Sequence, residues 1–349
     1  MRALKTILII LGVLIALAII IGATGSPAFH YERSVTIAAP VDVVYPHVSS
    51  LGALDKWSPW NEKDPAMKKS LEGVDGTVGA VAKWEGNDDV GTGEQRIDSL
   101  VPNKLMRTHL TFHDWAMEST AGIALSENGD STRVTWFMEG QNEGMSGFFR
   151  KVMGVFIDMD ARLGKDFETG LGQLKTLAEE DAMKEKEATA KLLAAYTIET
   201  GDRPAALYVG LRKTIKWADM KQFFTEAFAT TGAALKAAKV KPAGAPAGVY
   251  FKWDEVNHEA DLLAGFPIAA DAKGKVTGVT EYETPASAAY WIQYKGGYNS
   301  MGPAHEALSA KIEMDGKEHH TNVIEEYVTD PGSTPDSTQW QTNIIYLTK

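Results

Sequence analysis

Thr321-Asn-Val-Ile-Glu-Glu-Tyr-Val-Thr-Asp-Pro331 is the stretch that decides how the last part of this 349-residue chain folds. Successive side chains of a strand point to opposite faces, so Glu325 and Tyr327 share one face and Glu326 lies on the other. The turn residues Asp330-Pro331-Gly332 then end the strand. A carboxylate on a buried face is costly unless it has a partner. Two interpretations stay open: Glu325 is an acid in a pocket, or the acidic pair guards an edge strand.

Composition excludes several classes of function. The chain has 44% hydrophobic and 23% charged residues and a formal net charge of −11, values ordinary for globular protein, and its length suggests two domains. Because no strongly basic segment follows the extreme N-terminus, we expect no nucleic-acid partner. The chain has no cysteine, which excludes disulfides, thiolate nucleophiles and Cys-containing zinc sites.

The N-terminus is basic and then apolar. Arg2 and Lys5 precede residues 6–23, which are uncharged and almost wholly aliphatic. A helix needs about 20 residues, or at least about 17, to cross a bilayer, so we predict a single transmembrane anchor within residues 1–26. The alternative is a signal peptide cleaved near Ala23-Thr24-Gly25. By the positive-inside rule the N-terminus is cytoplasmic and the rest of the chain extracytoplasmic, in the periplasm.

A first soluble domain is predicted over residues 27–180. Phe29–Ile37 alternates as a strand, and a short helix follows at Val41–Val48. Further strands, separated by glycine-bearing turns typical of an antiparallel meander, are predicted at Gly79–Trp84, Gly91–Leu100, Leu105–Phe112, Met117–Ser126 and Thr132–Gly140. From Phe149 to Leu177, apolar residues recur at three- and four-residue steps, which predicts one long amphipathic helix. The order predicts an α+β helix-grip fold, whose sheet and long C-terminal helix enclose a cavity suited to an apolar ligand.

Four segments of this domain carry a family resemblance. They are Tyr31-Glu-Arg-Ser-Val-Thr-Ile-Ala-Ala-Pro40, Trp57-Ser-Pro-Trp60, Gly91-Thr-Gly93 and Gly164-Lys-Asp-Phe-Glu-Thr-Gly170-Leu171. The domain resembles polyketide cyclase/dehydrase-type proteins of the SRPBCC (START-like) class. The resemblance implies a cavity for a hydrophobic ligand and no shared catalytic residue. The residues predicted to form core and cavity wall are Trp57, Trp60, Trp84, Trp115 and Trp136.

A charged, helix-forming linker is predicted over residues 181–193, and a second domain over residues 194–349. The first half of that domain is predicted to have strands at Ala194–Thr200, Ala205–Arg212, Gly248–Trp253 and Ala260–Pro267, with a turn at Gly201-Asp202 and a helix at Asp219–Ala238. The second half is predicted to have strands at Val276–Glu281, Ala286–Tyr294, Thr321–Thr329 and Gln339–Leu347, with a helix at Met301–Glu313. Pro204-Ala-Ala-Leu-Tyr208 recurs in outline as Pro285-Ala-Ser-Ala-Ala-Tyr290. These patterns predict a duplicated ββαββ unit whose sheet forms one concavity facing both helices.

Aromatic residues concentrate in the predicted strands of this domain and, beside an acid, would suit a flat or cationic ligand. The motifs are Tyr250-Phe-Lys-Trp-Asp-Glu255, Ala264-Gly-Phe-Pro-Ile268, Tyr294-Lys-Gly-Gly-Tyr298 and Ile324-Glu-Glu-Tyr-Val-Thr-Asp-Pro331. They resemble the GyrI-like small-molecule-binding domain, which is also the effector-binding domain of AraC-type regulators. The resemblance implies that Glu325 lies in the ligand cleft with Tyr327 on the same face. The predicted ligand-binding residues are Glu325, Tyr327, Tyr298, Tyr294, Tyr250, Trp253, Tyr208 and Trp291.

No metal or cofactor site is predicted. His109 and His113 are four residues apart in a predicted strand and would share a face, but a metal site needs a third ligand. The chain has no Walker loop and no Gly-x-Gly-x-x-Gly, His-Glu-x-x-His or Gly-x-Ser-x-Gly motif. No helix-turn-helix accompanies the effector-like domain, which argues against a transcription factor.

The sequence therefore predicts a membrane-anchored protein that captures or senses hydrophobic, cationic or aromatic small molecules. A GyrI-like hydrolase of reactive cyclopropane-bearing compounds is one alternative, with Glu325 as its catalytic acid or as the group that orients a water. A protein of the envelope stress response, whose domains bind protein partners, is another.

Overall fold

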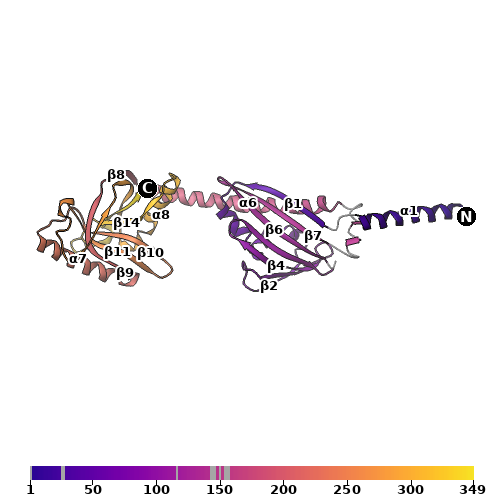
Figure 1. Cartoon of the computed structure of the whole chain (residues 1–349), viewed down its shortest axis with the longest axis horizontal. Helices are drawn as coiled ribbons and strands as arrows, with labels where there is room; N and C mark the ends of the chain where they lie inside the picture. The colour runs from indigo at the N-terminus through magenta and orange to yellow at the C-terminus, as the bar shows by residue number, and fades with distance from the viewer. Residues whose placement is uncertain (1, 25–27, 115–116, 142–146, 149–150, 153–157) are drawn as a thin grey trace. The chain divides into compact units, whose positions relative to one another are not determined.

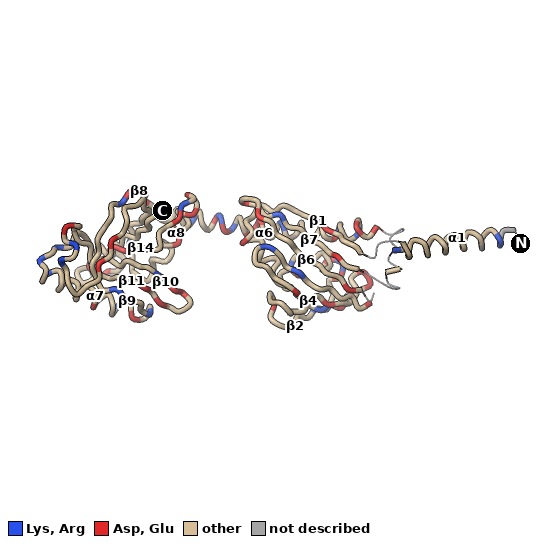
Figure 2. The backbone as a smooth tube through the Cα atoms, in the orientation of Figure 1, with Lys and Arg blue, Asp and Glu red and all other residues tan. Residues whose placement is uncertain are grey.

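A computed structural model describes residues 2–24, 28–114, 117–141, 147–148, 151–152 and 158–349 of the chain. They divide into two compact units, Met1–Glu185 and Lys186–Lys349. Each unit is mixed α+β and is built on one antiparallel sheet (Figure 1). Acidic and basic positions are interspersed along both units (Figure 2).

Helix α1 (Arg2–Thr24) opens the chain. Its segment Lys5–Thr24 is long and apolar enough to cross a membrane, by length and composition. Most of the side chains described along it are exposed, Ile9 by 66% and Leu14 by 55%. The alternative cleavage site reaches Gly25, which lies outside the described residues.

The sheet of unit 1 has seven strands in the order β1-β7-β6-β5-β4-β3-β2, and all neighbouring pairs are antiparallel. The strands are β1 (Ala28–Ile37), β2 (Lys68–Glu72), β3 (Val81–Glu85), β4 (Thr92–Val101), β5 (Leu105–Phe112), β6 (Met117–Asn128) and β7 (Ser131–Gln141). The predicted meander is confirmed, because each of its strands is present within two residues of the predicted bounds. The sequence does not predict β2, whose residues are all exposed and show no apolar alternation.

The described helices of unit 1 that follow β1 cover one face of this sheet. They are α2 (Val41–Val44), the 3-10 turn η1 (Tyr45–His47), α3 (Leu51–Asp55), α4 (Trp60–Lys63) and the long α6 (Met159–Ala194). Phe167, Leu171 and Leu174 of α6 pack on the sheet in one buried cluster, as the apolar stripe predicts. The single helix predicted from Phe149 is wrong at its start, because Asp158 is not helical and α6 begins at Met159. Phe149 itself lies outside the described residues. The predicted linker is helical, since α6 runs through it to Ala194.

Aromatic side chains fill the described interior between sheet and helix. The Trp136 ring stacks on Phe167 with centroids 4.4 Å apart, and Trp57 and Trp60 meet Trp136 edge-on at 5.1 and 5.4 Å. Trp57 and Trp136 are buried, as predicted for core residues. Trp115, from the same predicted set, lies outside the described residues.

The sheet of unit 2 has eight strands in the order β12-β9-β11-β10-β14-β15-β13-β8. The strands are β8 (Ile198–Arg203), β9 (Ala206–Lys216), β10 (Ala247–Asp254), β11 (Glu259–Ile268), β12 (Thr280–Thr284), β13 (Ser287–Lys295), β14 (His319–Tyr327) and β15 (Gln341–Thr348). The helices and 3-10 turns are η2 (Trp217–Asp219), α7 (Met220–Ala238), η3 (Ala270–Ala272), η4 (Tyr298–Ser300), α8 (Gly302–Met314) and η5 (Ser337–Gln339). The order is symmetrical about the β10–β14 pair, with β11 and β15, β9 and β13, and β12 and β8 at matching places.

Both long helices of unit 2 lie on the same face of its sheet. Phe223 of α7 packs with Tyr250 and Leu262, and Leu308 of α8 packs with Ile344. The pairing register puts these strand residues on one face, because paired residues of neighbouring strands share a face. This is also the face of Glu325, which pairs with Ile344.

Two predicted strands begin too early, because β8 begins at Ile198 rather than Ala194 and β12 begins at Thr280 rather than Val276. Two other local predictions are wrong. Gly201-Asp202 is not a turn but lies inside β8, paired with Ala289 and Ala288 of β13, and the break comes at Pro204. Pairing with a distant strand outweighs the local turn preference of Gly-Asp. His113 is not on the strand face of His109, because β5 ends at Phe112 and His113 lies in the following turn.

Candidate functional site

Glu325 is the one acid of unit 2 that lies within the buried layer between sheet and helices, and it is 5% exposed. Its strand β14 lies at the centre of the sheet, where β10 and β15 pair with its two edges. The residue paired with it in β10 is Gly248. A side chain at Gly248 would come within 3.0 Å of the Tyr327 hydroxyl, so the glycine leaves room for the ring that covers Glu325.

Two phenol groups donate to the same oxygen of this carboxylate. The Tyr327 hydroxyl donates to Glu325 Oε2 over 2.7 Å, and the Tyr250 hydroxyl donates to it over 3.1 Å. The two hydroxyls also lie 3.1 Å from each other. Donors aimed at a carboxylate favour its charged form, so this pair stabilises the Glu325 anion without neutralising it.

The other oxygen faces helix α8. His305 Nε2 lies 3.2 Å from Glu325 Oε1, and His305 Nδ1 lies 3.1 Å from the hydroxyl of Tyr346 on β15. A continuous chain of polar contacts therefore runs from the phenols through the carboxylate and the imidazole to Tyr346. In the part of the chain that the structure describes, no lysine or arginine forms an ion pair with Glu325.

Aromatic rings lead from this buried carboxylate toward the surface. Tyr327 contacts Tyr298 edge-on at 5.3 Å, and Tyr298 contacts Trp340 at 4.9 Å between ring centroids. On the other side, Phe224 and Phe228 of α7 meet Tyr327 at 5.5 and 6.1 Å. Tyr298 is 36% exposed, so this aromatic row joins the buried acid to solvent.

The ionisation of these phenols is suppressed. Burial raises the pKa of Tyr250 and of Tyr327 well above the ordinary value, and the nearby Glu325 carboxylate raises both further. Burial followed by the charge of Glu325 also raises the pKa of Tyr298. Burial is also the chief cause that raises the pKa of Tyr346 to about 12. The phenols therefore remain neutral donors at every physiological pH.

One further polar group of this face has no partner. Thr342 pairs with Tyr327 across β14 and β15 and is fully buried. In the described residues, its hydroxyl has no hydrogen-bond partner. Buried hydroxyls are usually bonded, so this one is open to a water or a polar group of a ligand.

Glu326 occupies the opposite face and has a different environment. Arg203 donates to its Oε1 over 2.7 Å and Asn343 to its Oε2 over 3.0 Å. The register puts Tyr208 and Trp291 on this face as well, in a cluster with Ile324. The charge of Glu326 is thus matched by an arginine, whereas that of Glu325 is not.

The structure brings together four of the eight residues predicted to bind ligand, Glu325, Tyr327, Tyr250 and Tyr298. Tyr294 lies on the same face, but its hydroxyl contacts Ser300. Trp253 is 51% exposed and stacks on Trp217 at 4.7 Å, with its ring 6.1 Å from Tyr250. Tyr208 and Trp291 lie on the opposite face, and no contact joins them to Glu325.

Four residues of the site escape sequence analysis: His305, Tyr346, Phe224 and Phe228. Phe224 and Phe228 fall in the helix predicted at Asp219–Ala238, where they cannot be told from ordinary core residues. His305 follows Pro303 in the first turns of α8, and no local pattern marks it. One signal could have indicated His305. It is a polar residue one turn into a helix whose buried face is otherwise apolar.

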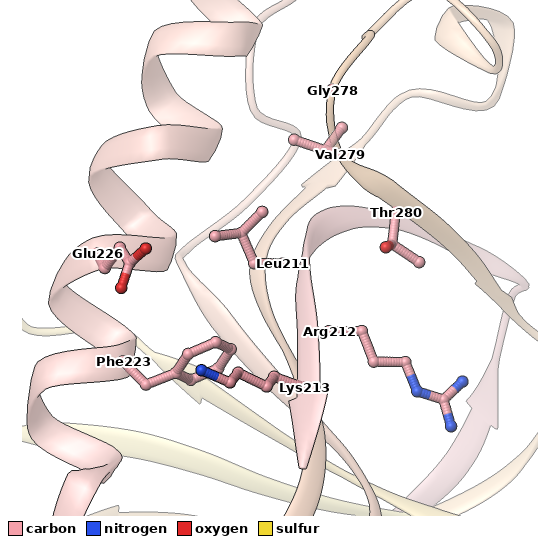
Figure 3. Close-up of a pocket in the computed structure, with 8 residues that line it drawn as sticks. All are labelled: Leu211, Arg212, Lys213, Phe223, Glu226, Gly278, Val279 and Thr280. Atoms are coloured by element: carbon pink, nitrogen blue, oxygen red, sulfur yellow. The ribbon is translucent and has the colours of Figure 1, made fainter. Parts of the chain in front are cut away.

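A hollow of about 450 Å³ lies elsewhere in unit 2, beside the outer edge of β9 (Figure 3). Figure 3 shows Phe223 and Glu226 of α7 on one side of it and Val279 and Thr280 on the other. β12 pairs with β9 only as far as Gly210, so the hollow adjoins the part of β9 that β12 does not cover. It is open to solvent and holds no buried charge. We therefore place the candidate site at Glu325, where the buried polar groups converge.

No group of three or more His, Asp or Glu side chains in the described residues is arranged to hold a metal ion. His109 Nε2 lies 3.7 Å from Glu118, its nearest acidic partner in the described residues.

A family of known proteins matches most of unit 1. Residues 28–179 match the family described as polyketide cyclase/dehydrase and lipid transport. No curated protein matches the chain. Among solved structures, the Aha1 dimer from Colwellia psychrerythraea is 18% identical (43% of this chain, 96% of that chain, TM-score 0.31). A truncated norcoclaurine synthase from Thalictrum flavum is 17% identical (43% and 92%, TM-score 0.34).

A third solved structure, EcmrR in complex with DNA, is 14% identical and covers 60% of this chain and 86% of that chain, with a TM-score of 0.38. Likenesses at this level carry nothing about ligands or partners. The family match is the finding that applies: residues 28–179 have the polyketide cyclase/dehydrase and lipid transport type of fold, of the SRPBCC class.

Proposed function

We propose that unit 2 binds flat organic cations at Glu325, in a protein that holds this site at a membrane. The observation that supports it is a buried carboxylate whose neighbours in the described residues are two phenols and one imidazole. A buried charge without a fixed counter-charge is unfavourable. A cationic ligand would supply that counter-charge, and the surrounding rings would add stacking and cation–π attraction.

The topology of unit 2 supports the same proposal. The strand order is symmetrical about β10–β14, and α7 and α8 stand at matching places in the chain. We infer an internal duplication of the GyrI-like type, in which Glu325 lies near the junction of the halves. The two helices then form the walls of the cleft, and the aromatic row from Trp340 through Tyr298 to Tyr327 is its entrance.

For unit 1 we propose a hydrophobic ligand, in keeping with the polyketide cyclase/dehydrase and lipid transport fold.

Helix α1 is proposed as a membrane anchor with its N-terminus in the cytoplasm and both units outside. Arg2 and Lys5 at its start favour this orientation. Protease added to spheroplasts should then digest the C-terminal unit while a cytoplasmic marker stays intact. Full protection of the C-terminal unit would overturn the orientation.

The binding proposal is tested with a matched pair of fluorescent probes. 10-Methylacridinium is a permanent cation, and 9-methylanthracene is its neutral isostere. We expect the full-length protein in lipid nanodiscs to bind the cation, and Glu325→Gln to weaken that binding by about tenfold or more, with little effect on the neutral probe. Empty nanodiscs provide the blank.

Glu326→Gln is the matched control, because it removes the neighbouring carboxylate from the opposite face of the same strand. It should leave the affinity for 10-methylacridinium within about twofold of that of the native protein. Equal loss in the two variants would show that net charge alone attracts the cation. An unchanged affinity in Glu325→Gln would remove Glu325 from the site.

Hydrolysis of a strained electrophile is the second candidate function. Glu325, Tyr327 and His305 form a connected set of acid–base groups, which is the observation in its favour. In such a reaction a water would form a C–O bond to one ring carbon and give its proton to Glu325, while the ring C–C bond breaks and Tyr327 donates its proton to the leaving carbon. The proton on Glu325 would then return to Tyr327 across their hydrogen bond. If this function is correct, the native protein should form product from a cyclopropane-bearing compound, and Glu325→Gln should form none.

A further inference from the structure

His305 is placed to respond to whatever binds at Glu325. It lies in the first turns of α8, and its side chain is 25% exposed, against 7% for the side chain of Glu325. Its Nε2 faces Glu325 Oε1 and its Nδ1 faces the Tyr346 hydroxyl. An ionised carboxylate only accepts hydrogen bonds, so the Nε2 atom must carry the proton in this contact.

The contact with Tyr346 is compatible with both charge states of the imidazole. When Nδ1 is unprotonated it accepts from the Tyr346 hydroxyl, and when it is protonated it donates to the same oxygen, because a hydroxyl can do either. Tyr346 stays neutral in both cases, since burial raises its pKa to about 12. His305 can therefore gain or lose its second proton without breaking a contact or leaving a buried group unpaired.

No other described side chain competes for this role. The ionisable groups around His305 and its acid are Tyr327 from β14, Tyr250 from β10, Tyr346 from β15 and Tyr298 from η4. The His319 ring also contacts Tyr346, at 5.6 Å between ring centroids. On β13, the hydroxyl of Tyr290 bonds to Asp315 and that of Tyr294 bonds to Ser300. Among these described neighbours, the imidazoles alone can carry a positive charge, and His305 is the one that contacts Glu325.

We propose that protonated His305 is the counter-ion of Glu325 in the ligand-free protein, and that an organic cation replaces it by driving the second imidazole proton into solvent. The inference rests on the proposed function, because it describes how the same site accepts its ligand. Two positive charges beside one buried carboxylate repel each other, so the ligand and the proton exclude one another. Binding becomes a one-for-one exchange of a cation for a proton.

The exchange predicts the pH dependence of affinity. Protons compete with the cation, and imidazole gains its charge within the range from about pH 8 to about pH 5. The affinity of the full-length protein in nanodiscs for 10-methylacridinium should therefore rise by about tenfold or more from pH 5.5 to pH 8, and that for 9-methylanthracene should change by less than about twofold. His305→Gln keeps a donor toward Glu325. In this variant the affinity for the cation should be high and should vary by less than about threefold from pH 5.5 to pH 8. An undiminished pH dependence in His305→Gln would overturn the inference, because Glu325 itself would then be taking up the proton.

Histidine NMR gives a second measurement that affinity cannot mimic. With selectively labelled histidine, the ring nitrogens of His305 should show an imidazolium at pH 6 without ligand and a neutral ring with saturating 10-methylacridinium. Saturating 9-methylanthracene should leave the imidazolium in place, and the other histidines serve as internal references. A neutral His305 ring in all samples, with Glu325-dependent binding intact, would overturn this inference alone. Failure of the cation to bind better than its isostere would overturn the proposed function.

Discussion

At the scale of single residues, the two tyrosines on Glu325 link stability to the site. Tyr327 donates to the carboxylate over 2.7 Å, and its side chain is partly buried. Tyr327→Phe removes this charge-assisted bond while keeping the ring, and should lower the free energy of unfolding by about 1–3 kcal/mol at pH 8. Urea denaturation measures this change in the free energy of unfolding. Tyr298→Phe, at the exposed end of the aromatic row, is the control. Equal stability of the native protein and Tyr327→Phe would contradict the hydrogen bond.

The same tyrosines predict an alkaline limit of stability. The pKa of Tyr250 and of Tyr327 is raised in the folded protein by burial and then by Glu325, whereas an unfolded tyrosine ionises near about pH 10. A raised folded pKa means that the stabilisation is fully present below about pH 10 and is lost as the pH rises further. Each such tyrosine should cost up to about 1.4 kcal/mol per pH unit above that point. Urea titrations at pH 9 and pH 11 should show a smaller loss in Tyr327→Phe, which has one titrating group fewer.

At the scale of elements, α6 has one glycine in a crowded position and one in an open position. Alanine substitutions there test the effects of packing and of helix propensity separately. A side chain at Gly170 would lie 2.8 Å from the Trp136 ring and 3.0 Å from Pro59, while one at Gly172 meets nothing within 4 Å. Gly170→Ala should destabilise the protein by about 1–3 kcal/mol, because rigid neighbours cannot move aside. Gly172→Ala should stabilise it by about 1 kcal/mol, since alanine is the better helix former. Thermal unfolding checks both, and a stabilising Gly170→Ala would contradict the close approach of α6 to the sheet.

Strands were predictable where their pattern was local and failed where a distant partner decided. Leu105–Phe112, one of the short strands predicted between turns, has the predicted bounds. β8 does not have its predicted bounds. Gly201 and Asp202 are turn-forming residues by local preference, but in the fold they pair with β13. β2 is recruited by β3 alone among the described strands, and its own residues show no preference that could reveal it. Pairing energy comes from the partner strand, which the local sequence does not contain.

At the scale of the whole molecule, the chain divides between Glu185 and Lys186, inside the continuous helix α6. Leu192 and Leu193 at the end of α6 pack against the core that α8 forms with β13 and β15. A fragment of residues 186–349 should therefore unfold cooperatively in urea. A fragment of residues 195–349, which loses both leucines, should be less stable by about 1–3 kcal/mol in total. Equal stability of the two fragments would show that the end of α6 contributes nothing to unit 2.

The sequence by itself determined that Glu325 and Tyr327 share a face of their strand, that Glu326 does not, and that the apolar residues from Leu163 to Leu177 belong to one helix. Each of these follows from the period of a strand or a helix, which is a property of neighbouring residues. The tertiary structure decided which other side chains meet Glu325. Tyr250 arrives through the β10–β14 register and His305 through the packing of α8, while the same registers place Tyr208 and Trp291 on the far face. Periodicity fixes the faces within one strand, but only the register between strands fixes which faces coincide.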